Sequence, residues 1–340
     1  MTDSSSYPKL IFGIYPGGAA GGDSGLLTGP PDDSRQVVDC VDELQGSVQP
    51  FIVRCYDSFQ DPGSPLHNAA SAPENYSQYA IAGSRPLDLV LQFRSASGDV
   101  PGYLNFIHEK LTQLHRHLYS VQITEEPNFV DGPNVIDGPY PNVKQAVVEG
   151  VIAAKETLRA LGHSDIKVGF NTTPTFGKSA DFWSNLKDLA DPRFFQALDY
   201  VGIDFFPDVF RPVAPDGQPG DLVAASTGVL ETLRNVWLPA ANISDQVPIH
   251  ITEHGWPTGA TRSEQRQAEV LDTMIRTADG LRARLNIHRY MVFALRDVDH
   301  PSGREDDSLF RFFGITAADY RRKPAFATFR EAIREFSSPA

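Results

Sequence analysis

The sequence predicts an α/β fold, a single (β/α)8 barrel that covers residues 1–340 as one domain. Three observations favour it. Eight short apolar runs rich in β-branched residues recur along the chain, helical patterns lie between them, and no linker-like change of composition interrupts this alternation. A count of eight strand–helix units indicates a closed parallel barrel rather than an open sheet.

The eight apolar runs are expected to form the strands of the barrel. They have the length of buried parallel strands, and turn-forming residues follow most of them. They are Lys9–Ile14, Pro50–Cys55, Leu87–Phe93, Leu118–Thr124, Asp165–Phe170, Tyr200–Phe205, Pro248–Glu253 and Arg289–Ala294.

Apolar residues at helical spacing indicate a helix after most of these strands. The clearest pattern stops before Gly162, as a C-terminal capping glycine would stop it. The expected helices are Ser34–Leu44, Tyr103–Leu118, Asn142–Leu161, Asp181–Leu198, Asp221–Leu238, Glu264–Ala283 and Ala325–Phe336. Segments rich in Pro, Gly and Ser follow several strands, where the functional loops of such barrels lie; they are 17–31, 58–73, 207–220, 258–263 and 297–307.

Composition and charge narrow the class of protein and its partners. Apolar residues make up 41% and charged residues 21%, which is typical of a globular domain. The net charge of −13, with no basic cluster, disfavours nucleic acids and anionic membranes as partners. No signal peptide or membrane-spanning run is visible, so we expect a cytoplasmic protein, although a trimmed leader would leave the same sequence. Cys40 and Cys55 fall in a predicted helix and strand and suggest no disulfide framework.

Two strand ends carry carboxylates. Val247–Gly259 reads as a strand that ends near Glu253, and Ser120–Asn128 as another that ends near Glu126. These are the seventh and fourth strands, whose ends face each other across the mouth of an eight-stranded barrel. Glycoside hydrolysis needs two such groups, a protonated donor and an ionised nucleophile or base. The two ends therefore predict a glycosidase site.

The residues around both acids resemble a known group of enzymes. Thr-Glu-Glu-Pro-Asn at 124–128 looks like the Asn-Glu-Pro signature of clan A glycoside hydrolases. Ile-Thr-Glu-His-Gly-Trp-Pro-Thr-Gly at 251–259 is similar to the nucleophile strand of family 17, and of families 5 and 39. Residues 290–297 and 313–325 read like the eighth strand and closing helix of the same group. The resemblance implies a retaining glycosidase that acts on β-linked sugars and needs no cofactor or metal.

The resemblance also implies roles for individual residues. Glu126 would be the acid/base, Glu253 the nucleophile, and Arg54 the cation that holds the nucleophile ionised. Three positions differ from the group, because Glu125 replaces an Asn, Phe206 a Tyr and Asp204 an Asn. Side chains on a strand alternate between its faces, so we expect Glu125 to lean sideways, toward an arginine.

The remaining candidates are proposed to bind the sugar. Aromatic side chains can stack on sugar rings, and polar ones at strand ends can hydrogen-bond to hydroxyl groups. For each, core packing or helix capping is the alternative. These candidates are Trp256, Tyr56, Phe206, Asp57, Asn171, Asp204, His254 and Arg296, with Gln92 and Arg94 closing the third strand as weaker choices.

Two other functions have to be weighed. Glu125, Asp204 and Phe206 depart from the group, so the main alternative is a barrel that binds carbohydrate without cleaving it. His250-Ile-Thr-Glu-His254 spells the H-x-x-E-H pattern of zinc proteases, but that pattern requires a helix and this segment reads as a strand. Gly17–Gly22 lacks the Lys-Ser/Thr of a phosphate-binding loop and is expected to be a flexible loop.

Overall fold

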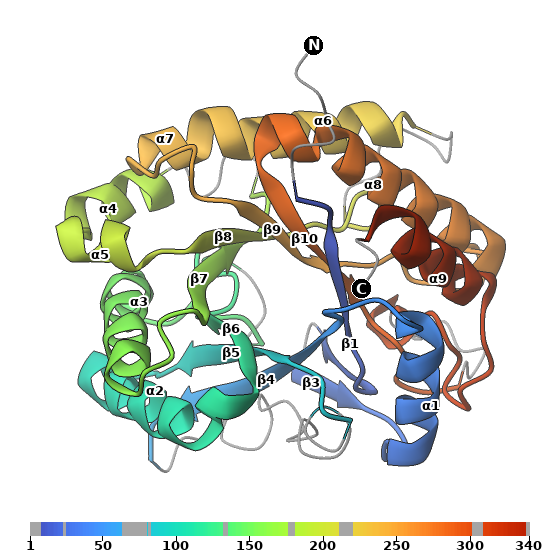
Figure 1. Cartoon of the computed structure of the whole chain (residues 1–340), viewed down its shortest axis with the longest axis horizontal. Coiled ribbons are helices and arrows are strands. Elements are labelled where there is room, and N and C mark those ends of the chain that lie inside the picture. The colour runs from blue at the N-terminus through green and yellow to red at the C-terminus, as the bar shows by residue number, and fades with distance from the viewer. Residues whose placement is uncertain are drawn as a thin grey trace.

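The computed structural model describes residues 8–22, 25–62, 80, 83–131, 135–175, 181–210, 220–300 and 309–337. Eight strands form a closed barrel in the order β1-β10-β9-β8-β7-β6-β5-β4, and every neighbouring pair is parallel. Helices surround the strands (Figure 1). The predicted (β/α)8 fold is confirmed. The strands are β1 (Ile11–Tyr15), β4 (Ile52–Gln60), β5 (Leu87–Arg94), β6 (Leu118–Ile123), β7 (Lys167–Thr172), β8 (Tyr200–Asp204), β9 (Ile249–His254) and β10 (Ile287–Phe293).

The outer helices bury one apolar face against the strands. In α3, for example, Val147, Val151 and Leu158 are buried at spacings of four and seven residues. Asp side chains cap the first turns of several helices by accepting hydrogen bonds from backbone N–H groups, as Asp33 does for α1. The helices are α1 (Ser34–Gln45), α2 (Val100–Leu114), α3 (Val143–Ala160), α4 (Asp181–Leu189), α5 (Pro192–Ala197), α6 (Leu222–Thr232), α7 (Leu238–Ala240), α8 (Glu264–Leu285) and α9 (Pro324–Phe336).

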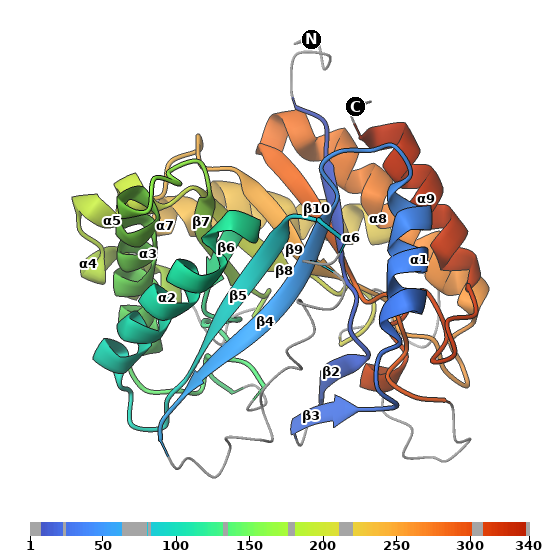
Figure 2. The same ribbon diagram turned by 60° about the horizontal axis from the view of Figure 1, so that its bottom comes forward.

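Three segments differ from the sequence prediction. The glycine-rich segment after β1 was expected to be a flexible loop, but it forms strand β2 (Ala19–Gly22), which pairs antiparallel with β3 (Gly25–Thr28). This hairpin lies at the end of the barrel where β1 ends (Figure 2). The helix expected over 181–198 is divided into α4 and α5, because Pro192 begins a new helix that Asp191 caps. The helix expected over 221–238 continues α6 through a π-helical turn at Leu233–Trp237.

The other expectations about the fold have simple outcomes. Cys40 and Cys55 are buried free thiols in α1 and β4. Within the described part of the chain, no helix combines the length and apolar character needed to cross a bilayer. Parts of the predicted functional loops, namely 63–73, 211–219 and 301–307, lie outside the described residues.

Candidate active site

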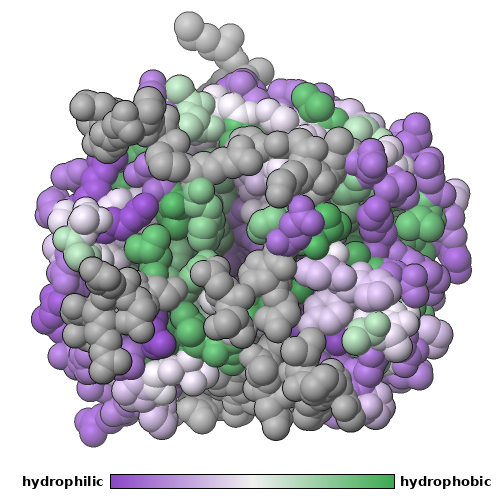
Figure 3. Space-filling model, turned by 180° about the vertical axis from the view of Figure 1, so that it is seen from behind, coloured by the Kyte–Doolittle hydropathy of each residue, from purple (hydrophilic) through white to green (hydrophobic). Residues whose placement is uncertain are grey.

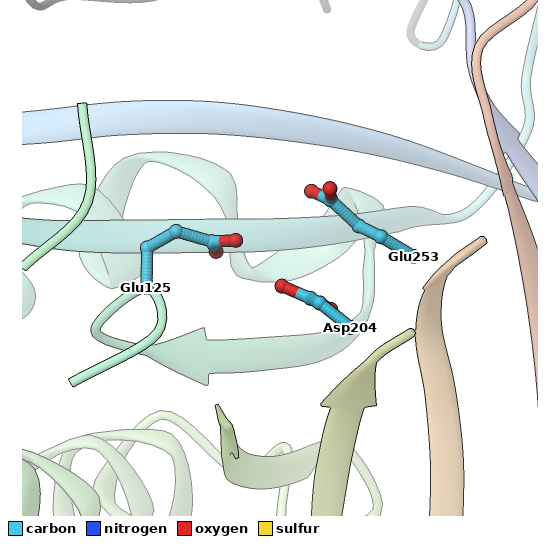
Figure 4. Close-up of side chains that lie close together, drawn as sticks. All are labelled: Glu125, Asp204 and Glu253. Carbon is cyan, nitrogen blue, oxygen red and sulfur yellow. The ribbon is translucent and has the colours of Figure 1, made fainter. Parts of the chain in front are cut away.

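Three carboxyl groups converge inside the mouth of the barrel (Figure 4). Glu125 follows β6, Asp204 ends β8, and Glu253 lies one residue before the end of β9. One oxygen from each of the three lies within 4.8 Å of the others, and all three residues are buried. The parallel strands bring these acids together because their carboxyl ends meet at one end of the barrel.

Arg54 on β4 is the cation of this cluster and is 0% exposed. Its Nη2 donates to Glu125 at 3.4 Å, and its Nε lies 3.4 Å from Glu253. Its Nη1 donates to Asp88 on β5 at 2.6 Å. Asp88 also accepts from Arg289, at 2.9 Å, and from Ser120. We call Arg54, Asp88, Ser120 and Arg289 the floor network, because it lies deeper in the barrel than the three acids.

Glu125 is held by three donors. Arg54 is one, Gln122 donates at 2.7 Å, and Asn171 donates at 3.2 Å. The predicted contact with an arginine is therefore present, but strand alternation does not explain it. Strand β6 stops at Ile123, and Thr124 and Glu126 have positive φ angles of 63° and 45°. This left-handed backbone turns two successive acids toward the same cavity, where a regular strand would separate them.

Glu126 lies beside this cluster and faces the cavity. It is half-buried, its backbone N–H donates to Asn171 at 2.9 Å, and its side chain hydrogen-bonds to Thr173. Burial raises the pKa of Glu126 well above its ordinary value, and the charges of Glu125 and Glu253 raise it further. Burial and the two neighbouring charges therefore favour the protonated form of Glu126.

Glu253 has a different set of partners. The hydroxyl of Tyr56 donates to Oε1 of Glu253, and the Nε of Arg54 lies close to the same oxygen. Burial and the charge of Glu125 raise the pKa of Glu253 to about 7, while Arg54 and Tyr56 act in the opposite direction. In the group that the sequence resembles, a Tyr occupies the position of Phe206. Here the phenol beside Glu253 belongs to Tyr56 on β4.

Asp204 is the third acid of the cluster, beside Glu125 and Glu253. It accepts from Asn171 at 2.5 Å and from Thr252 at 2.6 Å. Burial and the charges of Glu125 and Glu253 raise the pKa of Asp204 well above its ordinary value. Glu125, Asp204 and Glu253 together have the oxygen ligands that a divalent cation prefers. The guanidinium of Arg54 contacts two of them, Glu125 and Glu253, and supplies a positive charge from within the protein.

A cavity of about 1220 Å³ opens above these acids, and Glu125, Glu126 and Glu253 all line it. The face of the molecule opposite to that in Figure 1 is hollowed near its centre, with hydrophobic residues beside the hollow (Figure 3). One side of the cavity is aromatic, with Tyr15 stacked on Phe293 at 5.1 Å between ring centroids. The aromatic residues that line the cavity are Tyr15, Tyr56, Phe129, Phe205, Phe206, Phe210, Trp237, Phe293, Phe310 and Phe313.

Two of the predicted sugar-binding residues do not reach this cavity. Trp256 is 5% exposed, and its ring packs under the guanidinium of Arg262 at 4.7 Å. His254 was expected in a loop but ends β9, and its Nδ1 shares a 2.5 Å hydrogen bond with the hydroxyl of Tyr290. Burial lowers the pKa of His254 to about 3, so it is neutral. The expectation that His254 lies in a loop is wrong, because β9 ends one residue later than predicted. Neither His254 nor Trp256 lines the cavity.

Two polar candidates are also structural. Strand β4 continues to Gln60, so Asp57 is not at its end, and the carboxylate of Asp57 pairs with Lys110 of α2 at 2.5 Å. Arg296 pairs with Asp32 at 2.8 Å and donates to the carbonyl of Pro30 at 2.7 Å. It therefore ties the segment after β10 to the segment after the hairpin. Neither residue lines the cavity.

Three residues of the site were missed. Gln122 donates to Glu125, Thr252 donates to Asp204, and Asp137 accepts from the backbone N–H of Glu125 at 2.7 Å. Gln122 and Thr252 are polar residues inside apolar strands, one or three positions before a predicted site acid. That position on the strand was the available signal. Asp137 lies in a loop, and nothing local marked it.

The closed parallel barrel with carboxyl groups at the ends of its strands defines the structural class of the chain, the (β/α)8 barrels. No protein-family model and no curated protein matches the sequence. Solved structures do match, at TM-scores of 0.57: a family 39 glycoside hydrolase from the gut symbiont Bacteroides cellulosilyticus WH2 (14% identity), a β-glucuronidase from Ruminococcus gnavus in complex with D-glucuronic acid (13%) and a β-glucosidase from Exiguobacterium marinum (12%).

These similarities cover nearly all of the chain but differ in how much of the other protein they span. The matches cover 98%, 96% and 89% of this chain, and 64%, 48% and 87% of those proteins, respectively. The chain thus spans about half to two thirds of the first two. At such low identity the likeness shows the fold, which is the fold of the glycosidases that the motifs resemble. Membership of family 17 has no support from these similarities.

Proposed function

We propose that the protein is a retaining glycosidase, with Glu126 as the acid/base and Glu253 as the nucleophile. The observation that carries the proposal is the unequal environment of two acids in one cavity. Burial and two neighbouring charges favour the protonated form of Glu126, whereas the ion pair with Arg54 and the hydrogen bond from Tyr56 favour the ionised form of Glu253. Retaining hydrolysis needs this division of roles.

The reaction follows from these positions. Glu126 protonates the glycosidic oxygen while a Glu253 oxygen attacks the anomeric carbon, so the bond to the leaving group breaks as the glycosyl–enzyme ester forms. Water, deprotonated by Glu126, then attacks the anomeric carbon and releases Glu253. The substrate is a carbohydrate, as the similar glucuronidase and glucosidase structures suggest. The Tyr56–Glu253 hydrogen bond favours hydrolysis over the alternative of carbohydrate binding alone, since it supplies the phenol absent at Phe206.

The choice of Glu126 over its neighbour Glu125 is testable with leaving groups of different acidity. In Glu126→Gln, hydrolysis of an alkyl glycoside should fall by about 10²- to 10⁴-fold, the usual contribution of an acid catalyst. A nitrophenyl glycoside, whose leaving group needs little protonation, should lose much less in the glycosylation step. The matched control is Glu125→Gln, which should impair both substrates to the same degree.

Glu253→Gln should abolish turnover of either substrate while the protein stays folded. Cleavage of the nitrophenyl glycoside by Glu253→Gln at the wild-type rate would overturn the nucleophile assignment. A leaving-group effect in Glu125→Gln instead of Glu126→Gln would exchange the roles of the two neighbours.

A further inference from the structure

Arg94, the last residue of β5, is a buried arginine in the wall of the same cavity as the proposed catalytic acids. It is 3% exposed, and its Nη2 donates to the backbone carbonyl of Val135. Its Nε and Nη1 have no hydrogen-bond acceptor among the residues that the structure describes. A guanidinium carries five N–H donors and no acceptor, so most of its hydrogen-bonding capacity is unused here.

An acidic neighbour does not account for this arginine. Among the groups that favour the charged form of Arg94, Asp137 has the largest effect, but the two form no ion pair within 4.0 Å in the described part of the chain. The Oδ2 of Asp137 is instead used by two backbone N–H groups, those of Phe93 and Glu125, both at 2.7 Å. Burying a cation without a close counter-ion is unfavourable, and proteins seldom retain such a group without a use.

We propose that Arg94 binds a carboxylate carried by the substrate, so that the enzyme prefers glycosides of uronic acids to those of neutral sugars. The inference rests on the proposed function. A planar guanidinium matches a carboxylate in shape and charge, and such charge-assisted hydrogen bonds are about twice as strong as neutral ones. Arg94, Glu126 and Glu253 line one cavity, so a substrate bound there with its glycosidic bond at the acids would carry its carboxylate toward the arginine.

The charge of the cavity makes this arginine selective. Glu125, Glu126 and Glu253 line it with Arg94, while the guanidinium of Arg54 lies below and is already shared among three acids. Ionised acids would repel an anionic substrate unless a cation formed an ion pair with the substrate carboxylate. Burial lowers the pKa of Arg94 from a very high ordinary value, so the side chain remains charged in the working range of pH.

The kinetic test compares sugars that differ only in the carboxylate. Nitrophenyl β-D-glucuronide and galacturonide are assayed against the corresponding glucoside and galactoside, with Arg94→Gln, Arg94→Lys and the wild type. In Arg94→Gln, kcat/KM for the preferred uronide should fall by about 10- to 150-fold, as expected for losing a hydrogen bond to a charged group. The neutral counterpart should change by less than about threefold, and Arg94→Lys should recover part of the uronide activity. Arg85→Gln is the matched control, because Arg85 is a buried arginine paired with Asp42 and Gln45 outside the cavity.

Calorimetric binding of free glucuronate, galacturonate and the two neutral sugars separates this inference from the proposed function. Uronate binding that Arg94→Gln removes supports Arg94 even if no glycoside is cleaved. Hydrolysis of neutral glycosides without uronate binding overturns the inference and leaves the glycosidase standing. Equal losses on acidic and neutral substrates, or a preference for a sulfated sugar over both uronates, would also overturn it.

Discussion

Two buried arginines on neighbouring strands, Arg54 on β4 and Arg94 on β5, have opposite surroundings. In the floor network, Arg54 and Arg289 share Asp88. Burial opposes ionisation of Asp88, but the two arginines hold its pKa below its ordinary value. In the cavity wall, Arg94 has one backbone carbonyl as its partner among the described residues. The comparison teaches that a buried arginine with acidic partners stabilises the barrel, whereas one without them is available to bind a ligand. Mutations at the two places should therefore have different consequences.

The largest expected effect is on stability at the floor. Asp88→Asn removes the charge that two buried guanidinium groups share, and breaking such a pair costs about 3–5 kcal/mol of the free energy of unfolding. Arg94→Gln removes a single hydrogen bond to a carbonyl and should cost about 1 kcal/mol. Urea denaturation of both variants at neutral pH measures the difference. If Arg94→Gln is as destabilising as Asp88→Asn, the arginine of the wall is structural.

The second prediction concerns pH and the acids of the mouth. Glu253 must be ionised to attack, and its pKa is raised to about 7; kcat/KM should therefore fall about tenfold per pH unit below pH 7. Glu126 must be protonated, and burial together with the charges of Glu125 and Glu253 raises its pKa well above the ordinary value, so the basic limb should lie at a higher pH than an ordinary glutamic acid would give. A pH–rate profile from pH 5 to 10 tests this order. An acidic optimum near pH 4 would contradict it.

The same pKa shift predicts a change of stability. Because the folded-state pKa of Glu253 is raised, the wild type loses stability as the pH rises from about 4.5 to about 7. Glu253→Gln has no such group, so it should melt at a higher Tm than the wild type at pH 8, and the gap should close at pH 4. Thermal unfolding at both values measures this. A difference in Tm that does not change with pH would show that burial does not raise the pKa of Glu253 in the folded state.

A smaller effect is expected for Tyr56. Its hydroxyl donates to Glu253 and lowers the pKa of that carboxyl against the effect of burial. In Tyr56→Phe the acidic limb of the pH–rate profile should therefore move to higher pH, and kcat should fall by about tenfold. Tyr103→Phe is the control, because the Tyr103 hydroxyl donates to the carbonyl of Leu91 in the barrel wall. A shift of the same size in both variants would assign the effect to packing.

The smallest effects are expected where the sequence suggested sugar contacts and the structure shows packing. Trp256→Phe and His254→Gln alter residues that do not line the cavity. Each should change KM by less than about threefold, while lowering Tm through lost packing. A large rise in KM at unchanged stability in either variant would show that the residue contacts the substrate after all.

The barrel could be predicted from the sequence because buried parallel strands leave continuous apolar runs. Seven strands were found within two residues of their observed limits, while β4 continues five residues beyond its predicted end. Glu126, Glu253 and Arg54 could be located because polar residues at the ends of such runs are unusual. The roles of Trp256, His254, Asp57 and Arg296 could not be judged in this way. Each depends on where a strand ends or on a partner elsewhere in the chain. No local signal marked Arg262 over Trp256, Tyr290 beside His254 or Lys110 beside Asp57.

The close approach of Glu125 and Glu126 to one cavity was also beyond sequence reasoning. It depends on positive φ angles at Thr124 and Glu126, which local preference would not assign to either residue. Arg94 was named as a weaker candidate at the end of its strand, but its burial could not be predicted, because arginine is most often exposed. It is buried because β5 continues to its last residue inside the barrel wall.

The central claim is that Glu253 attacks the anomeric carbon. Treatment with a 2-deoxy-2-fluoroglycosyl fluoride slows the release step, so the glycosyl–enzyme accumulates and can be mapped by mass spectrometry of the digested protein. We expect the label on Glu253 and none in Glu253→Gln. A label on Glu125 or Glu126, or turnover with inversion of configuration and no labelled peptide, would contradict the account.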